Sequence, residues 1–482
     1  MLALGAMAVL GAAAVWMGGL NQDEGWYLYA ANLVAEGQVP YRDFAYTQGP
    51  VMPFVYSSFV WIWRMFGLAG ARVFTFLLGA AGIVFAMGLA RRFVPEERRS
   101  AVSLVMLLLL GCNIYHLYYL AIPKTYALAA LFVMVGFYLL KVAVDRKPWL
   151  ALLAGIALAF AAGTRISLGA ILPIVGLYLL FLRRFRVLVW FCAGGFGALL
   201  LVYGPFLADA GAREGLVAAQ AYHAARGGFD VTWVVGSLSR LVRWYLPLFI
   251  VLGLGLGNRR IVDSSILLLS FLAVFAVQML APFPYEDYQV PIMGLLAVFA
   301  AVNFIGTPTT NHQPLTTNLL LVLGMCFACS FGSPLLEKWS TNGQDRFWSL
   351  KKEQFELRQL QEVACEINAM DPGGTELFTQ DLYLAIETGR KVPKGLEMGP
   401  FAIHTDEEWR KLILSAPCRI AAMSGYAFAI EPPSCAERPM KQQIEYWGLL
   451  KRNYELVAKE DSFGQNATSL LILKRKEAES GR

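Results

Sequence analysis

The chain is 482 residues long, and its composition excludes most classes of soluble protein. Hydrophobic residues make up 57% of it, charged residues only 16%, and the mean hydropathy is +0.50, which is above the range of soluble globular domains. The formal net charge of +6 comes mainly from basic loops between apolar segments, so it indicates membrane topology and not a nucleic-acid partner. We therefore expect a polytopic membrane protein.

Apolar blocks follow one another along the first two thirds of the chain. Each is about 17–22 residues long, the length with which a helix crosses a hydrocarbon core of about 30 Å. The sequence predicts about eleven spans, near residues 2–20, 72–90, 101–118, 125–141, 149–163, 167–182, 187–207, 240–257, 264–281, 289–305 and 317–333.

Basic residues in the short loops predict the orientation of these spans. The strongest clusters all fall on one side: Arg91, Arg92, Arg98 and Arg99; Lys141, Arg146 and Lys147; Arg183, Arg184 and Arg186; Arg259 and Arg260. By the positive-inside rule this side is cytoplasmic. We therefore expect the N-terminus inside and the chain after residue 333 outside the cytoplasm.

A polar stretch, NQDEGWYLYAANLVAEGQVPYRDFAYTQGP at residues 21–50, follows directly on the first span. Asn21 can cap a helix in which Glu24 completes a capping box, and Gly37 can end it. One side of this helix would carry Trp26, Tyr27, Ala30, Leu33 and Val34. We therefore expect an amphipathic helix in the membrane interface, and a second one within residues 50–67.

The tail, residues 335–482, is predicted to be a separate extracytoplasmic α/β domain. Its pattern indicates helices at 345–370, 381–390 and about 440–451, and strands at 375–380, 418–430, 454–460 and 469–476. It has no Gly-rich phosphate loop, metal-ligand spacing or nucleophile elbow. We expect a lid or an interaction module, in which single substitutions of acids such as Asp381 or Asp406 leave turnover on a small soluble acceptor largely intact.

Two segments resemble those of a known superfamily. The stretch DEGWYLYAANLVAEGQVPYRDFAYTQGPVMPFVY at 23–56, followed by an Arg-initiated span at 71–94, resembles the first extracytoplasmic loop of the GT-C glycosyltransferases. Within these it is most similar to the bacterial branch of protein O-mannosyltransferases, aminoarabinose transferases and lipopolysaccharide galacturonosyltransferases. PYEDYQVPIMGLLAVFAAV at 284–302 is similar to the motif with which a late span of these enzymes begins. The resemblance implies a GT-C-like membrane domain at residues 1–334 and an outer domain at 335–482, in a bacterial cytoplasmic membrane.

The resemblance also implies a reaction and a base. The donor would be a polyprenyl-phosphate sugar, and inverting transfer needs a carboxylate to take the proton of the acceptor hydroxyl. The family's loop acid corresponds to Asp23, with Glu24 beside it as a second candidate catalytic residue. Neither acid requires a function, because acids in a first helical turn stabilise a helix by about 0.3–1 kcal/mol.

The leaving lipid phosphate calls for a cation. Lys124 and Arg165 lie at predicted outer turns between apolar spans. Placing a charge near hydrocarbon costs free energy, which favours a functional role for each cation. The alternative is that each side chain snorkels to the interface and binds no ligand. Some relatives carry a Lys two residues before the proline that follows the loop, where this chain has Gln48. We expect Tyr27 and Gln48 to contact substrate.

A second acidic pair, Glu286 and Asp287, lies at a predicted outer mouth between Tyr285 and Tyr288. These four residues are candidates for binding the acceptor, and the acids for binding a divalent cation, but the pattern favours a solvated turn. His223 has no partner at metal-ligand spacing. We therefore predict no metal site and no certain cofactor.

The function predicted from the sequence is an inverting glycosyltransferase that moves a sugar from a polyprenyl-phosphate donor to an extracytoplasmic glycolipid or envelope glycan. A protein O-glycosyltransferase is the nearer alternative. A transporter or flippase of lipid-linked sugars also fits the composition, although transporters place broken spans and polar sites at the midplane, whereas here the polar residues gather at one face.

Overall fold

The structure, a computed structural model, describes residues 2–225, 228–256, 261–306, 354–399, 406–424, 440–465 and 467–476. It divides into two compact units. The first consists of Met1–Val15, Thr47–Met52 and Val73–Phe347, and the second of Trp16–Tyr46, Pro53–Arg72 and Trp348–Arg482. The sequence predicts that the loop at 21–71 belongs to the membrane domain, with one boundary at 334. In this division most of that loop groups with the C-terminal domain.

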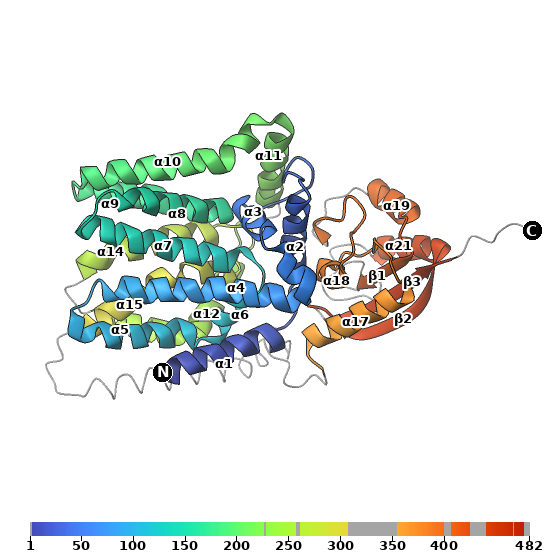
Figure 1. The fold of residues 1–482 in the computed structure, drawn as a ribbon, viewed down its shortest axis with the longest axis horizontal. Helices are drawn as coiled ribbons and strands as arrows, with labels where there is room; N and C mark the ends of the chain where they lie inside the picture. Colours follow the sequence, from blue (N-terminus) through green and yellow to red (C-terminus); the bar gives the residue numbers. More distant parts are fainter. Residues whose placement is uncertain are drawn as a thin grey trace, which may run out of the picture. The chain divides into compact units, whose positions relative to one another are not determined.

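The first unit is a bundle of apolar helices (Figure 1). They are α1 (Leu2–Met17), α5 (Arg99–Met106), α6 (Ile114–Ala121), α7 (Thr125–Asp145), α8 (Leu150–Thr164), α9 (Ile171–Phe181), α10 (Phe185–Ala208), α11 (Ala210–Ala225), α12 (Val231–Trp244), α13 (Leu246–Gly255), α14 (Ile261–Met279), α15 (Met293–Gly306) and the greater part of α4 (Val60–Arg91). Each predicted span within the described residues coincides with an apolar helix or helix pair of this bundle. The span predicted at 317–333 lies outside the described residues.

Four helical segments among the described residues are long and apolar enough to cross a membrane, and up to seven if each bent pair is one span. The four are Val60–Arg91, Thr125–Asp145, Phe185–Ala208 and Glu286–Gly306. Shorter apolar helices make up other predicted spans, such as Leu150–Thr164.

Small residues bring α8 and α10 into close contact. A Cβ atom at Gly155 would lie 2.3 Å from the carbonyl oxygen of Phe191, and one at Gly194 would lie 2.0 Å from that of Leu152. The two backbones therefore approach more closely than larger residues would permit, as is typical of membrane helices. This contact, with that of α7 against α8, forms one layer of the bundle.

Two predicted spans are broken. The segment predicted at 101–118 bends by 69° between Gly111 and Ile114, and the one at 240–257 bends by 82° between α12 and α13. Asn113 caps α6, since its side chain accepts a hydrogen bond from the His116 amide, and its Nδ2 donates to the Trp244 carbonyl at 2.9 Å. The two breaks are therefore bonded to each other, which a hydropathy pattern does not reveal.

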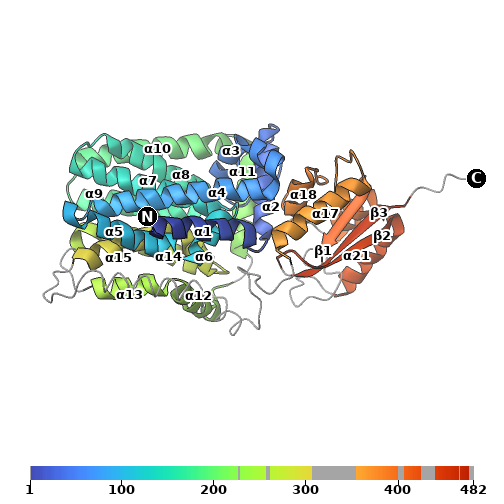
Figure 2. The same ribbon diagram turned by 60° about the horizontal axis from the view of Figure 1, so that its bottom comes forward.

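The second unit combines most of the loop at 21–71 with the C-terminal domain. The loop contains α2 (Gln22–Ala35), most of α3 (Val51–Ser57) and the start of α4; the C-terminal domain contains α17 (Glu356–Met370), α18 (Leu382–Thr388), α19 (Asp406–Ser415), α21 (Met440–Asn453), β1 (Ile420–Ser424), β2 (Tyr454–Phe463) and β3 (Thr468–Arg475). Both α17 and α21 contact β2 (Figure 2).

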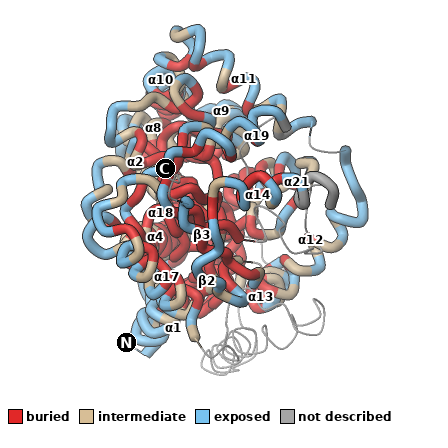
Figure 3. The backbone as a smooth tube through the Cα atoms, turned by 90° about the vertical axis from the view of Figure 1, so that its right-hand side faces the viewer, coloured by how far each residue is buried: buried red, intermediate tan, exposed pale blue. Residues whose placement is uncertain are grey.

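The three strands form an antiparallel sheet in the order β1-β3-β2. The central strand β3 is largely buried and the edge strand β2 largely exposed (Figure 3). The strand predicted at 375–380 is wrong: Glu376 and Phe378 form only isolated bridges, to Lys391 and Ala421. The predicted helix at 345–370 is described from Glu356 onward, and α19 was not predicted.

Candidate active site

The first turn of α2 is held by the capping box that the sequence predicts. The Asn21 side chain accepts the amide hydrogen bond of Asp23 at 3.0 Å, and the Asn21 amide donates to Glu24 Oε1 at 2.9 Å. Gly37 follows the helix end with a φ of +88°, a conformation that glycine adopts readily. The local sequence therefore fixes where Asp23 and Glu24 lie on the helix.

Glu24 is bound by Arg72, near the start of the Arg-initiated span. The Arg72 guanidinium donates to both carboxylate oxygens of Glu24 at 2.7 Å, and to the carbonyls of Gly18 and Gly19 at 2.9 Å. Both side chains are fully buried. Glu24 therefore has a structural role, which argues against the catalytic role predicted for it, because Arg72 binds both of its carboxylate oxygens.

Asp23, one residue earlier, is half-buried and borders a group of aromatic rings. Its Oδ1 accepts a hydrogen bond from Trp26 Nε1 at 3.1 Å. The Trp26 ring stacks on Tyr27 with centroids 3.9 Å apart, and Tyr46 packs edge-on against Trp26 at 5.3 Å. Tyr27 is almost completely buried, so its ring packs against protein, which argues against the substrate contact predicted for it.

The prediction that α2 is an amphipathic interfacial helix is wrong. Its buried residues include the polar Gln22 and Glu24 as well as Trp26 and Leu33. A helix that is buried on several sides is a core element and not a surface one. The aromatic spacing suggested one apolar face, but the polar residues of α2 also have partners within the same unit.

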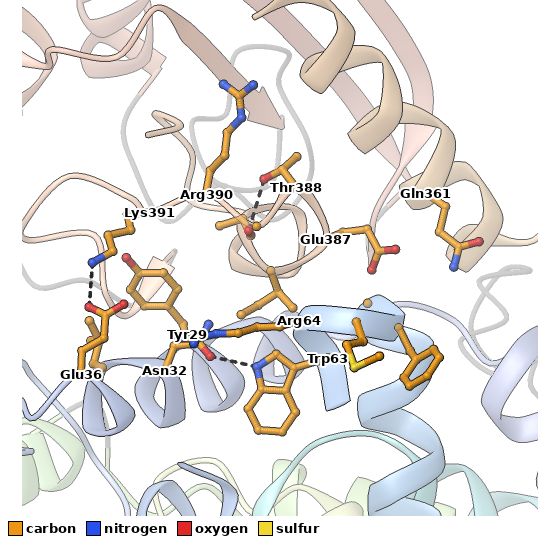
Figure 4. A pocket seen from close by; sticks show the side chains of 17 residues that line it. Tyr29, Asn32, Glu36, Trp63, Arg64, Gln361, Glu387, Thr388, Arg390 and Lys391 are labelled. Carbon is orange, nitrogen blue, oxygen red and sulfur yellow. Dashed lines mark hydrogen bonds and ion pairs between the residues drawn. The ribbon is translucent and has the colours of Figure 1, made fainter. Parts of the chain in front are cut away.

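The second unit has a polar groove of about 700 Å³ between α2, the start of α4 and α18 (Figure 4). At one end, Glu387 accepts a hydrogen bond from the Leu68 amide at 2.7 Å, and Gly67 adopts a φ of +58° beside its carboxylate. Burial raises the pKa of Glu387, although this hydrogen bond acts in the opposite direction. Glu387 thus caps the part of α4 that begins at Leu68. At the other end, Lys391 and Glu36 form an ion pair at 2.8 Å.

The predicted cations lie together in the first unit. Lys124 directly precedes α7, and Arg165 follows α8 and opens the 3₁₀ turn η3 (Ile166–Ala170). Both are nearly buried, with 6% of each exposed. Arg165 lies over the rings of Tyr126 and Tyr288, with its guanidinium carbon 5.0 and 4.5 Å from their centroids. Snorkelling to the interface does not describe such enclosed side chains.

The second acidic pair belongs to the same cluster. Asp287, in the 3₁₀ segment η4 (Glu286–Ile292), binds Lys124 Nζ at 2.9 Å and accepts from the Tyr126 hydroxyl at 2.8 Å. Glu286 pairs with Arg240 of α12 at 3.0 Å. The prediction of a solvated turn is therefore wrong, because both acids have cationic partners. Tyr285 is partly exposed and packs edge-on against Trp233 and Tyr288.

Lys124 and Asp287 should depend on each other for stability. Lys124→Met leaves a buried carboxylate without its cation, so we expect a loss of about 3 kcal/mol, the lower end of the range for buried pairs, because both side chains keep slight solvent access. The double variant Lys124→Met/Asp287→Leu should recover most of it. Unfolding by detergent titration measures this, and equal losses in the single and double variants would contradict the pairing.

The remaining predicted residues are less informative. Gln48 is half-buried in the segment that belongs to the first unit. His223 lies in α11, but its side chain is outside the described residues. Within the described part of the chain, no group of three or more His, Cys, Asp or Glu residues is arranged to hold a metal ion.

Sequence reasoning missed Arg72, Tyr126 and Arg240. A single Arg at the start of an apolar span is a signal that a partner must exist, since an unpaired buried guanidinium is too costly. The identity of that partner is not encoded locally, because Arg72 and Glu24 lie 48 residues apart. The same holds for Lys124 and Asp287, which are separated by 163 residues.

Solved structures with the same architecture exist. The chain is similar to ArnT from Cupriavidus metallidurans bound to undecaprenyl phosphate, with a TM-score of 0.64 and 14% identity over 100% of this chain and 98% of that one. The chain has the GT-C fold. The apo form of the same ArnT gives a TM-score of 0.64 and 16% identity over 98% of this chain and 97% of that one.

A more distant member of the GT-C fold is the archaeal oligosaccharyltransferase AglB from Archaeoglobus fulgidus, in complex with an inhibitory peptide and a dolichol-phosphate. Its TM-score is 0.52 at 11% identity, over 92% of this chain and 72% of that one. No protein-family model and no curated protein matches the sequence. The fold resemblance inferred from the sequence is confirmed. Sequence identities this low show a shared fold and nothing more.

Proposed function

We propose that the chain is an inverting glycosyltransferase of the bacterial cytoplasmic membrane, which transfers a sugar from a polyprenyl-phosphate donor to an extracytoplasmic glycolipid or envelope glycan. The observation that carries the proposal is the similarity, along the whole chain, to ArnT, an aminoarabinose transferase solved with undecaprenyl phosphate. The apolar helices and the half-buried Asp23 at the start of α2 support it.

Asp23 is the proposed general base. Its carboxylate takes the proton of the acceptor hydroxyl while the hydroxyl oxygen forms a bond to the anomeric carbon of the donor. The bond between that carbon and the phosphate oxygen breaks, and the polyprenyl phosphate leaves with the electron pair. Asp23 suits this role better than Glu24, because only Asp23 retains solvent access while Glu24 is bound by Arg72.

Arg165 is the proposed contact to the lipid phosphate. Lys124 and Arg165 together with Asp287 leave one net positive charge in the cluster, and Lys124 directly neutralises Asp287. A guanidinium held between two tyrosine rings is preorganised to meet the charge that develops on the leaving phosphate. Lys124 then contributes mainly by holding Asp287.

Arg165→Gln should weaken binding of polyprenyl phosphate at least about tenfold, because a hydrogen bond to a charged group contributes about 1.5–3 kcal/mol. Competition of unlabelled polyprenyl phosphate against the donor measures the effect. Arg213→Gln, an exposed arginine in α11 of the same unit, is the matched control and should bind normally. Equal affinity in the two variants would remove Arg165 from the phosphate site.

Reconstituted vesicles test the function itself. We expect sugar label from a polyprenyl-phosphate donor to appear in the glycolipid or glycan fraction. Label in the protein fraction would assign a protein O-glycosyltransferase instead. Movement of donor across the bilayer without a glycosidic product would overturn the enzyme proposal in favour of a transporter.

A further inference from the structure

One stripe of α2 is in contact with the C-terminal domain throughout. Gln22, Gly25 and Tyr29 of α2, and Glu36 directly after it, recur at intervals of three, four and seven residues, which places them on the same side of a helix with 3.6 residues per turn. A Cβ atom at Gly25 would lie 2.2 Å from the amide nitrogen of Tyr383. The Tyr29 hydroxyl accepts the Val392 amide hydrogen bond at 3.0 Å.

The N-terminal end of this stripe is fixed by a buried polar network. Gln22 Nε2 donates to Asp381 Oδ1 at 2.7 Å, and the Tyr383 hydroxyl donates to the same oxygen at 3.0 Å. The backbone amide of Gln22 donates to Gln465 Oε1 at 2.7 Å. Thus both the backbone and the side chain of Gln22 are held by residues of the C-terminal domain.

Asp381 is fully buried, and burying a carboxylate is costly unless its hydrogen bonds repay the cost. Gln22 and Tyr383 both donate to Oδ1, and Ser424 also favours the charged form of the carboxylate. The sequence predicts that substitution of Asp381 leaves turnover largely intact, because the tail lacks catalytic motifs; the burial of Asp381 against Gln22 of α2 argues against this. The side chain of Asp406, the other acid we named, lies outside the described residues.

Asp23 follows Gln22 directly, so it lies about 100° further round the helix axis. The C-terminal domain therefore holds one side of the first turn of α2 and leaves Asp23 on the adjacent side, where it is half-exposed. A rotation of this turn would redirect the Asp23 carboxylate. The Asp381 contacts oppose such a rotation.

We propose that Asp381, acting through Gln22 and Tyr383, is a positioning residue that sets the direction of Asp23 for glycosyl transfer. The proposal rests on the proposed function and assigns a role in it to the C-terminal domain. Asp381 itself takes no proton and touches no substrate.

The test compares Asp381→Ala, Asp381→Asn, Gln22→Ala and the double variant Asp381→Ala/Gln22→Ala. Asp381→Ala should lower kcat per folded molecule by on the order of 10–10²-fold, since small misplacements of a reacting group have effects of this size, and leave KM for the donor unchanged. Asp381→Asn retains an acceptor oxygen for Gln22 and should recover most of the rate. The double variant should be no slower than Asp381→Ala, because both changes break the same contact.

Hydrogen exchange of residues 20–26 provides a readout that does not depend on activity. Exchange should accelerate in Asp381→Ala and remain near wild type in Asp381→Asn. Asp461→Asn, an exposed acid of the same domain, is the matched control and should change neither rate nor exchange.

Two outcomes would overturn the positioning role. One is an unchanged kcat in Asp381→Ala despite faster exchange, and the other is additive rate losses in the double variant. These failures differ from failure of the proposed function, in which wild-type protein itself makes no glycosidic product.

Discussion

Asp23→Asn should reduce sugar transfer by on the order of 10²–10⁴-fold, the contribution typical of a general base. The substitution keeps the size of the side chain and an oxygen that can accept from Trp26 Nε1, and it removes only the charge and basicity. Folding and donor binding should persist. The measurement is product formed per folded molecule at saturating polyprenyl-phosphate sugar.

The alternative role of Asp23 makes a different prediction. If the carboxylate only complements the helix dipole, the variant should lose no more than about 1 kcal/mol of stability and turn over normally. Asp43→Asn is a matched control in the same loop, because Asp43 is partly exposed and paired with Arg42. Normal turnover of Asp23→Asn would exclude Asp23 from the mechanism.

The sequence predicts those features of the structure that depend on neighbouring residues. Apolar blocks predict the positions of the helices, because a membrane span needs an unbroken run of apolar residues. The capping box at Asn21 and the end of α2 at Gly37 are also confirmed, since every group involved lies within one or two helical turns.

Features that depend on distant residues were predicted poorly. The partners of Glu24 and Asp287 are far along the chain, so the sequence alone predicts a capping-box acid at Glu24 and a solvated turn at Asp287. The segment at 375–380 has the alternation of a strand but finds only isolated bridge partners. The conformation of such a segment depends less on its local propensity than on whether a strand edge is available to pair with it.

The broken helices show a third kind of failure. Hydropathy treats residues 101–118 as one span, yet one helical segment ends at Gly111 and Asn113 caps the next. His116 Nδ1 lies 2.9 Å from the Tyr245 hydroxyl, at the second break. Non-helical backbone at such a position is tolerated where protein groups satisfy it. Polar residues inside an apolar block are therefore the sequence signal for such breaks.

Glu24→Gln should destabilise the second unit by about 4–5 kcal/mol, the upper end of the range for breaking a buried ion pair. Arg72 would remain fully buried without its counter-ion. This effect is several times larger than the helix-dipole contribution of about 0.3–1 kcal/mol, which is all that the local sequence predicts. Arg72→Met should be equally destabilising, because it leaves Glu24 as an uncompensated buried carboxylate.

The double variant Glu24→Gln/Arg72→Met separates pairing from other effects. It removes both charges, so its stability should exceed that of either single variant. Recovery should be incomplete, because the carbonyls of Gly18 and Gly19 also lose the Arg72 guanidinium as their donor. Resistance to unfolding in a denaturing detergent provides the comparison. A double variant as unstable as the sum of the two single variants would show that the charges do not compensate each other. In that case Glu24 would again be a candidate for a role other than stabilising the fold.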